Sequence, residues 1–409
     1  AYKKNEIPYA TQLFTPDWIV KYMVENSLGR YYVEHNNDKD IINHWKYFIN
    51  DNLTINNNRI DPKQITFIDP CCGSGHILVY AFEVLYQIYL NSGYSKNDIP
   101  ELILTNNLYG LDIDDRAGQL AILSVLLKAR EYEKNIFNKE IVRNLNIMSI
   151  QESDSIDKSS LYFLNNGELK DKLIYLINTF ENAKEIGSLL LVDAYDYLSL
   201  INKIREDNNL FNSSMMEKLE SLLKVAYILQ KKYDVVVTNP PYMSQSYMPT
   251  HLKSYLNKFY LISKNDLCTA FMNSSLVTKL GYLGMITQQS WMFLSSFENL
   301  RKNIIENKNI VCMLQLGSHA FEEIGGEVVQ TTSFIIQNKV INDKSIFFRL
   351  VNYDDAKTKE RKFLEINNNK LNDYYLKEQN EFLKIPGCPI AYWISKRYIR
   401  IFEQNERLA

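Results

Sequence analysis

An apolar segment that ends at two consecutive prolines restricts what this chain can fold into more than any other feature. Residues 233–238 are rich in β-branched valine, and such a run favours a buried strand. The strand must stop there, because Pro240 and Pro241 donate no backbone hydrogen bond and keep Asn239 out of helical geometry. The sequence therefore predicts that the Asn239 side chain and the Pro240 carbonyl are held at the carboxyl edge of a sheet, with Tyr242 beside them. Two acceptors and one aromatic face can hold a planar amine while its nitrogen lone pair stays free to attack.

The size and composition of the chain are those of a globular protein. Its 409 residues exceed one average domain and allow a large α/β core with insertions. No apolar stretch approaches the ~20 residues that span a bilayer, and no charged-then-apolar leader stands at the amino terminus. Five cysteines without CxxC spacing then favour a reducing cytoplasm, and five scattered histidines predict no metal site. Because the chain begins with Ala1 rather than Met, we expect a fragment of a longer protein.

The first half alternates strands and helices. Residues 65–68 form a predicted strand before a glycine-containing loop and an apolar helix over 76–90, and a second strand over 107–111 precedes a helix over 116–133. This order predicts a mostly parallel, doubly wound α/β sheet. Ahead of it, we expect a helix from about residue 16 to 28, capped by Thr15 with Pro16 in its first position, and then a mobile or peripheral insertion over 36–60.

The second half is predicted to complete the sheet after a helical insertion. Residues 151–230 have a polar, helical pattern with one strand-like stretch at 188–192, and residues 266–279 form a predicted helix. Strands are predicted at 282–287 and 311–316, and residues 332–337 and 346–350 are predicted to close the sheet as an antiparallel pair. We therefore divide the chain into five segments: 1–64, 65–150 for cofactor binding, 151–230 as the insertion, 231–350 as the catalytic half, and 351–409 as the start of a truncated carboxyl-terminal region.

The loop from Asp69 to Gly75 has the composition of a ligand-binding turn. Its glycines, 73 and 75, allow close approach of a ligand to the backbone, and the following helix directs its amino terminus at that ligand. A carboxylate at the first position would repel a pyrophosphate but suits an ammonium or sulfonium group. Asp112, at the end of the next predicted strand, stands where Rossmann-like sites hold ribose hydroxyls, with Ile113 against the base. The alternatives are a structural turn for the loop, and a solvated acidic cluster with Asp114 as a rival for Asp112.

Two further sets of residues have weaker patterns. Phe321 follows a predicted strand, where an exposed ring would form a stacking pair with Tyr242, although core packing is the alternative.

The net charge of the chain is −2, whereas a protein that binds DNA alone usually has a clear excess of basic residues. DNA binding would therefore need a local positive face or a partner. Lysines 253, 258 and 264, or the basic residues 396, 397 and 400, can line a phosphate path; solvated helix faces are the alternative for both groups.

Taken in order, five motifs resemble those of the S-adenosylmethionine-dependent DNA methyltransferases that act on the amino group of adenine. These are FTP at 14–16, DPCCGSG at 69–75, GLDID at 110–114, NPPY at 239–242 and LGSHAF at 316–321. The stretches TQLFTPDWIVKYMVENSLGR and IPGCPIAYW are most similar to the methyltransferase of BREX phage-defence systems.

The resemblance implies a Rossmann-like domain with S-adenosylmethionine as cofactor. The implied reaction is methyl transfer to N6 of an adenine flipped out of double-stranded DNA. The implied setting is restriction–modification or BREX-type defence, with other defence proteins as partners. The implied catalytic residues are Asn239, Pro240, Pro241, Tyr242 and Phe321. The implied cofactor-binding residues are Thr15, Pro16, Asp69, Pro70, Cys72, Gly73, Gly75, Asp112 and Ile113, and no metal is implied. Glu152, Asp193 and Asp196 are candidates for the acidic contact to the cofactor's adenine.

Three alternatives fit the same motifs. NPPY also occurs in enzymes that methylate glutamine side chains of translation factors, since an amide nitrogen is also a planar amine. The chain can instead be a cofactor-binding scaffold for defence proteins without methylation of its own. The near-neutral charge also allows a fragment that binds cofactor but no DNA.

Overall fold

The computed structural model describes residues 15–56, 58–143, 145–156, 158–163, 167–206, 213–321, 329–340, 343–370 and 372–404. Within these residues, one sheet has the strand order β3-β2-β1-β4-β5-β7-β6-β8-β9. The strands are β1 (Phe67–Asp69), β2 (Leu108–Asp112), β3 (Ile147–Ser149), β4 (Tyr233–Thr238), β5 (Val277–Gln288), β6 (Asn309–Gly317), β7 (Thr331–Gln337), β8 (Lys344–Arg349) and β9 (Tyr374–Glu378).

The sheet is mostly parallel, as predicted. Strands β1 to β5 run parallel to one another, whereas β7 is antiparallel to both β5 and β6, and β9 is antiparallel to β8. The prediction of a closing pair between 332–337 and 346–350 is wrong, because β7 enters between β5 and β6 while β8 pairs in parallel with β6. The strand order reverses beside β1, which has β2 on one side and β4 on the other. A crevice outside the carboxyl ends of the strands is expected at such a reversal.

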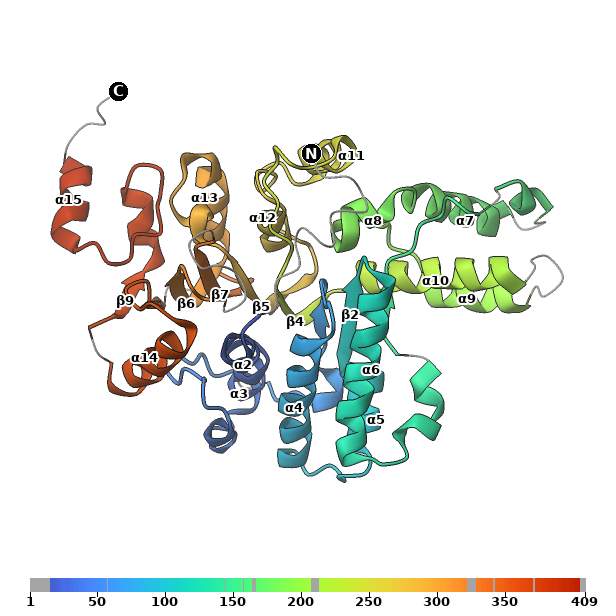
Figure 1. Ribbon diagram of the computed structural model, residues 1–409, viewed down its shortest axis with the longest axis horizontal. Helices are drawn as coiled ribbons and strands as arrows, with labels where there is room; N and C mark the ends of the chain where they lie inside the picture. Colours follow the sequence, from blue (N-terminus) through green and yellow to red (C-terminus); the bar gives the residue numbers. More distant parts are fainter. Residues whose placement is uncertain are drawn as a thin grey trace.

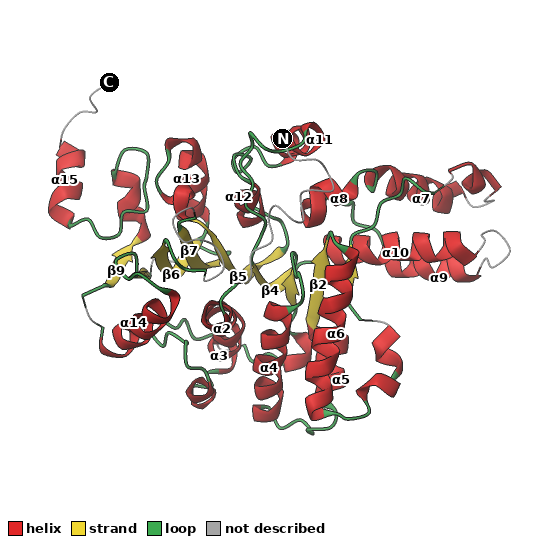
Figure 2. Cartoon of the chain, viewed as in Figure 1, coloured by secondary structure: helices red, strands yellow, loops and turns green. Residues whose placement is uncertain are grey.

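Two layers of helices cover the sheet (Figures 1 and 2). One apolar cluster packs side chains such as Phe67 and Val235 against the first layer, and the other packs Ile68 and Val236 against the second. Neighbouring residues of a strand thus serve opposite faces, as the two-residue period of a strand requires. The first layer contains α2 (Asp17–Val24), α3 (Arg30–Asn36), α4 (His76–Asn91), α5 (Ile99–Leu102), α6 (Asp115–Tyr132) and α14 (Ala356–Asn369).

The second layer includes the helical insertion. Its elements are α7 (Gly167–Thr179), α8 (Ala183–Ile186), α9 (Tyr197–Glu206), α10 (Ser213–Gln230), α11 (Thr250–Phe259), α12 (Leu267–Met272) and α13 (Glu298–Asn307). A last helix, α15, spans Lys396–Gln404. None of the helices in the described ranges is long and apolar enough to cross a membrane.

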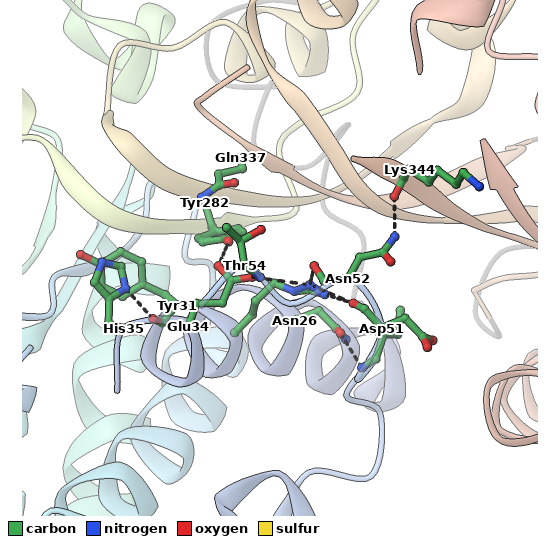
Figure 3. A network of polar contacts seen from close by, with 12 residues as sticks. Asn26, Tyr31, Glu34, His35, Asp51, Asn52, Thr54, Tyr282, Gln337 and Lys344 are labelled. Atoms are coloured by element: carbon green, nitrogen blue, oxygen red, sulfur yellow. Dashed lines mark hydrogen bonds and ion pairs between the residues drawn. The ribbon is translucent and has the colours of Figure 1, made fainter. Parts of the chain in front are cut away.

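The first described helix is longer than predicted and starts differently. A π-helical turn, Glu25–Gly29, joins α2 to α3. The predicted Thr15 cap is wrong: Pro16 is the N-cap, and no side chain caps the helix. Figure 3 shows how α3 is tied to the sheet by Glu34, which accepts hydrogen bonds from the Tyr282 hydroxyl and from the Thr54 backbone N–H, the latter at 3.0 Å.

The segment over 36–60 is not a peripheral insertion in its described part. Trp45, Tyr47, Phe48 and Ile49 are buried in the same cluster as α2 and α4. Trp45 packs so closely on Gly29 that a Cβ there would lie 2.8 Å from its ring. The prediction of a peripheral insertion followed from the many polar residues around these four side chains. The four side chains themselves belong to the hydrophobic core.

Three other local predictions need correction. Residues 187–189 form a 3₁₀ turn instead of a strand over 188–192, and a strand was missed at β3. The helix predicted over 266–279 ends at Met272, after which the chain enters β5. Beyond residue 351, β9 extends the sheet and α14 packs on α2 through Phe363. The division of the chain into five segments stays a prediction.

Candidate active site

A pocket lies outside the carboxyl ends of β1, β2 and β4, where the strand order reverses. It encloses about 850 Å³, including open solvent at its mouth. It is lined by Pro70, Cys71, Gly73, Asp112, Ile113, Asp114, Ala117, Lys184, Glu185, Ile186, Gly187, Ser188, Asn239, Pro241, Leu267 and Phe271. Six residues predicted from the sequence are therefore brought together here: 70, 73, 112, 113, 239 and 241.

The glycine-containing loop after β1 forms the floor of this pocket. Gly73 has φ +52° and Gly75 has φ +87°, both in the left-handed region that favours glycine. A Cβ on Gly75 would lie 2.9 Å from the Cα of Ala121, so this glycine lets the start of α4 pack against α6. The Cys72 N–H donates to the Leu111 carbonyl at 2.9 Å, which fastens the loop to the end of β2.

Asp69 supports the loop from below instead of lining the pocket. Asp69 is 1% exposed, and its carboxylate accepts a hydrogen bond from the Cys71 N–H at 3.0 Å. Burial raises the pKa of Asp69 to about 7, with a smaller contribution from the nearby charge of Asp112. Asp69 is therefore not placed to contact a cationic group of a ligand directly. Cys72 likewise turns into the core, and Cys71 lines the pocket in its place.

Asp112 is both a lining residue and a structural bridge. Its Oδ2 accepts from the Gly73 N–H at 2.8 Å, and its Oδ1 accepts from the Asp114 N–H at 2.9 Å. Burial raises the pKa of Asp112, and these backbone donors counteract part of the rise. Asp114, the rival for the same role, caps α6 by accepting from Arg116 and Ala117. Each carboxylate oxygen has a second lone pair, so Asp112 can accept further hydrogen bonds from a ligand.

The NPPY turn forms the opposite wall. Asn239 and Pro241 line the pocket and Pro240 is buried. Tyr242 is half-buried, with its hydroxyl turned inward near Cys268 and Asp266; burial is the main cause that raises the pKa of this hydroxyl. Within the described residues the hydroxyl has no hydrogen-bond partner. The turn is fixed by the next segment, because the Leu267 N–H donates to the Met243 carbonyl at 2.9 Å.

The helical insertion closes the pocket, which the sequence did not reveal. Helix α8 and the following turn, η9 (Gly187–Leu189), contribute five lining residues, from 184 to 188. The Ser188 hydroxyl donates to the Pro70 carbonyl and joins the insertion to the glycine-containing loop. Glu152 accepts from the Lys184 N–H at 3.2 Å and so holds α8 from behind, whereas Asp193 and Asp196 are exposed and do not line the pocket.

The chemistry of the lining fits a nucleoside. Asp112 supplies an acceptor for ribose hydroxyls, and Ile113, Pro241, Leu267 and Phe271 supply apolar surface for a base. Neither Leu267 nor Phe271 was singled out from the sequence. The helical, apolar pattern at the start of α12 is the signal that could have found them.

The chain matches a known protein family over its central part. The model of the Eco57I restriction-modification methylase family matches residues 106–321, more than half of the chain. The chain belongs to that family.

Individual relatives extend the similarity beyond the matched region. The chain is 39% identical over 437 residues to the "Adenine-specific methyltransferase PglX" of Lacticaseibacillus casei (strain Zhang), and 37% identical over 443 residues to the "Adenine-specific methyltransferase BrxX" of Escherichia coli O9:H4 (strain HS). These alignments cover 99% and 98% of the chain but 36% of each relative, so the chain spans about a third of their length.

The fold has a counterpart of known structure. It is similar, with a TM-score of 0.51, to a nuclease-deletion mutant of the Type ISP restriction-modification enzyme LlaGI, solved with a DNA substrate mimic. The match covers 95% of this chain and 32% of that one at 12% identity, and it therefore supports the fold alone.

Other residues predicted to act at the site lie outside the pocket lining. Phe321 is 6% exposed and packs in the cluster that contains α2 and α4, so the prediction of an exposed stacking ring is wrong. Thr15 and Pro16 do not line the pocket, but the start of α2 lies near the loop, since Asp17 is 3.5 Å from His76 at the start of α4. Phe14, the first residue of the FTP motif, lies outside the described residues.

Proposed function

We propose that this chain is the catalytic part of an S-adenosylmethionine-dependent enzyme that methylates N6 of adenine in DNA. The observation that carries the proposal is the shared pocket: Asn239 and Pro241 of the NPPY turn face the same cavity as Gly73, Asp112 and Ile113. A nucleoside-type cofactor held by the last three would thus lie next to the NPPY turn, which carries the amine acceptors. The adenine-specific methyltransferases to which the chain is similar support the choice of substrate.

The residues present suit this cofactor. Asp112 would accept hydrogen bonds from its ribose, and the apolar side chains of Ile113, Leu267 and Phe271 would contact its adenine. The backbone of the loop around Gly73 approaches the cofactor closely because no Cβ intervenes. Bound S-adenosylmethionine supplies an electrophilic methyl group on a sulfonium centre.

The NPPY turn would prepare the amine. The Asn239 side-chain oxygen and the Pro240 carbonyl accept hydrogen bonds from the N6 amino group of an adenine that has left the DNA stack. These acceptors would favour tetrahedral geometry at N6 and so direct its lone pair at the methyl donor, and the amino group would release one proton to solvent. Catalysis rests on positioning and on fixed dipoles rather than on a strong base. The half-buried ring of Tyr242 is the remaining candidate for stacking on the base, since Phe321 is in the core.

We place this activity in restriction–modification or BREX-type phage defence, with other defence proteins as partners. The family description supports restriction–modification, and the resemblance of the sequence motifs supports BREX-type defence. The test supplies methyl-labelled cofactor with duplex DNA, or with a translation release factor that carries a glutamine acceptor. Label in N6-methyladenine is expected. Label in the release factor alone would contradict the proposal in favour of the glutamine alternative, and label in neither would favour a non-catalytic scaffold.

Asn239→Ala tests the assigned role. We expect about a 10²- to 10³-fold lower turnover, the scale seen when one fixed hydrogen-bonding group is removed from a catalytic site, with cofactor affinity nearly unchanged in calorimetry. The exposed Asn135, outside the pocket, offers the matched control Asn135→Ala. An equal loss of cofactor affinity in Asn239→Ala would assign Asn239 to cofactor binding instead.

A further inference from the structure

The segment directly after the NPPY turn forms a compact projection beside the pocket. Its base is closed by hydrogen bonds from the Gln245 N–H to the Asn265 carbonyl, at 3.0 Å, and from Leu267 to Met243. The chain between these two hydrogen-bonded pairs contains α11. We call residues 244–265 the α11 projection.

The α11 projection contains no acidic residue. Between Asp234 and Glu298 the sequence has a single acid, Asp266, and this side chain is 6% exposed and caps α12. The same stretch contains Lys253, Lys258 and Lys264 within the projection. In a chain whose net charge is −2, so long a stretch with one buried acid creates a local positive surface.

Some lysines in the described part of the chain, among them 128, 139, 172 and 184, form ion pairs with carboxylates. No ion pair joins Lys253, Lys258 or Lys264 to a carboxylate of the described residues. The first two are exposed, and the ammonium of Lys258 lies 4.8 Å from the ring centre of Phe259, which is itself 44% exposed. The cationic groups are therefore available to an external anion.

Helix α11 is held rigidly against the pocket by its opposite face. Leu252 and Leu256 are fully buried, and the Tyr260 hydroxyl donates to the Leu189 carbonyl at 2.8 Å. The Tyr255 hydroxyl accepts from the Leu191 N–H at 2.8 Å. Both carbonyl and N–H belong to the stretch that follows the pocket-lining residues of the insertion. Glu185 lies 3.5 Å from His251 of the projection and lines the pocket.

We propose that the outer face of the α11 projection binds the phosphate backbone of duplex DNA next to the pocket. Unpaired lysines beside an exposed aromatic ring, in a segment that contains no acidic residue, match the chemistry of a polyphosphate strand. The rigid attachment to the pocket wall fixes the distance between the backbone contact and the catalytic turn. The inference rests on the proposed function for the choice of DNA, but it concerns binding and is tested without methyl transfer.

The test measures binding of this chain to a fluorescent duplex as a function of salt concentration. The triple variant Lys253→Ala/Lys258→Ala/Lys264→Ala is compared with Lys96→Ala/Lys134→Ala/Lys339→Ala, which removes three exposed lysines that have no ion pair within the described residues and lie in loops at the opposite edge of the sheet. Each lost phosphate contact reduces the slope of log affinity against log salt by about 0.9. We therefore expect a slope flatter by about 2.7 for the α11 triple and an unchanged slope for the control triple.

Each outcome decides between the possibilities. An unchanged slope in the α11 triple, an equal change in both triples, or no binding of the unmodified chain to the duplex would overturn the inference. A loss confined to single-stranded RNA of the same length would assign the surface to a different partner. If the unmodified chain methylates DNA but the α11 triple has an unchanged salt slope, the α11 projection is not the DNA-binding surface and the proposed function stands. If the α11 triple has a flatter slope but the unmodified chain does not methylate DNA, the DNA-binding surface stands and the proposed function is wrong.

Discussion

Replacing Asp112 by Asn tests whether this residue organises the cofactor loop as well as the ligand. The carboxylate accepts from the backbone N–H groups of Gly73 and Asp114 with separate oxygens. An amide has one acceptor oxygen, so one of these donors would face an NH₂ group. A hydrogen bond to a charged acceptor contributes about 1.5–3 kcal/mol. Since 1.4 kcal/mol is a factor of ten, protection of the Gly73 amide should fall about 10- to 150-fold if the variant amide faces it.

Hydrogen exchange of the peptide that contains Gly73 measures this directly and needs no assumption about global unfolding. Asp114→Asn is the matched control, because Asp114 caps α6 and Asn is an equally good N-cap. The control should leave exchange in the loop unchanged, whereas Asp112→Asn should make exchange in the loop faster and lower the affinity for the cofactor. Unchanged exchange at both Gly73 and Asp114 in Asp112→Asn would refute the bridging role, even if cofactor affinity fell.

Two more predictions concern the loop and the helix beneath it. Gly73→Ala should lower stability by about 1–2 kcal/mol through its positive φ alone, since no atom lies within 4 Å of the new Cβ, whereas Gly75→Ala should add about 1–3 kcal/mol from the clash with Ala121. Equal losses in thermal unfolding would contradict the assigned clash. Glu25, which accepts from the Tyr47 N–H and the Tyr80 hydroxyl, has its pKa raised by burial to about 8. A raised pKa in the folded state gives stability that is present below about pH 4.5 and is lost as the pH rises through about 8. Glu25→Gln should therefore gain in unfolding temperature relative to the parent between pH 5 and pH 8, and parallel curves would show that Glu25 does not titrate as described.

The sequence predicted the elements that depend on neighbouring residues. The strand before NPPY, the loop at 69–75 and the helix after it were all found where expected, because prolines, glycines and apolar periodicity act locally. The predictions were wrong where the burial of a residue differs from what the polarity of its sequence neighbours indicates. Trp45 and Phe48 are core residues within a polar segment, and Phe321 is buried although it follows a strand end.

What the sequence determined by itself was the set of turns at the carboxyl ends of β1, β2 and β4, since each turn is encoded in a few consecutive residues. What only the tertiary structure decided was their common environment. The pocket wall at 184–188, the position of β7 between β5 and β6, and the burial of Phe321 all depend on contacts between distant segments. Such contacts are selected by packing and burial over the whole chain, which no local pattern records.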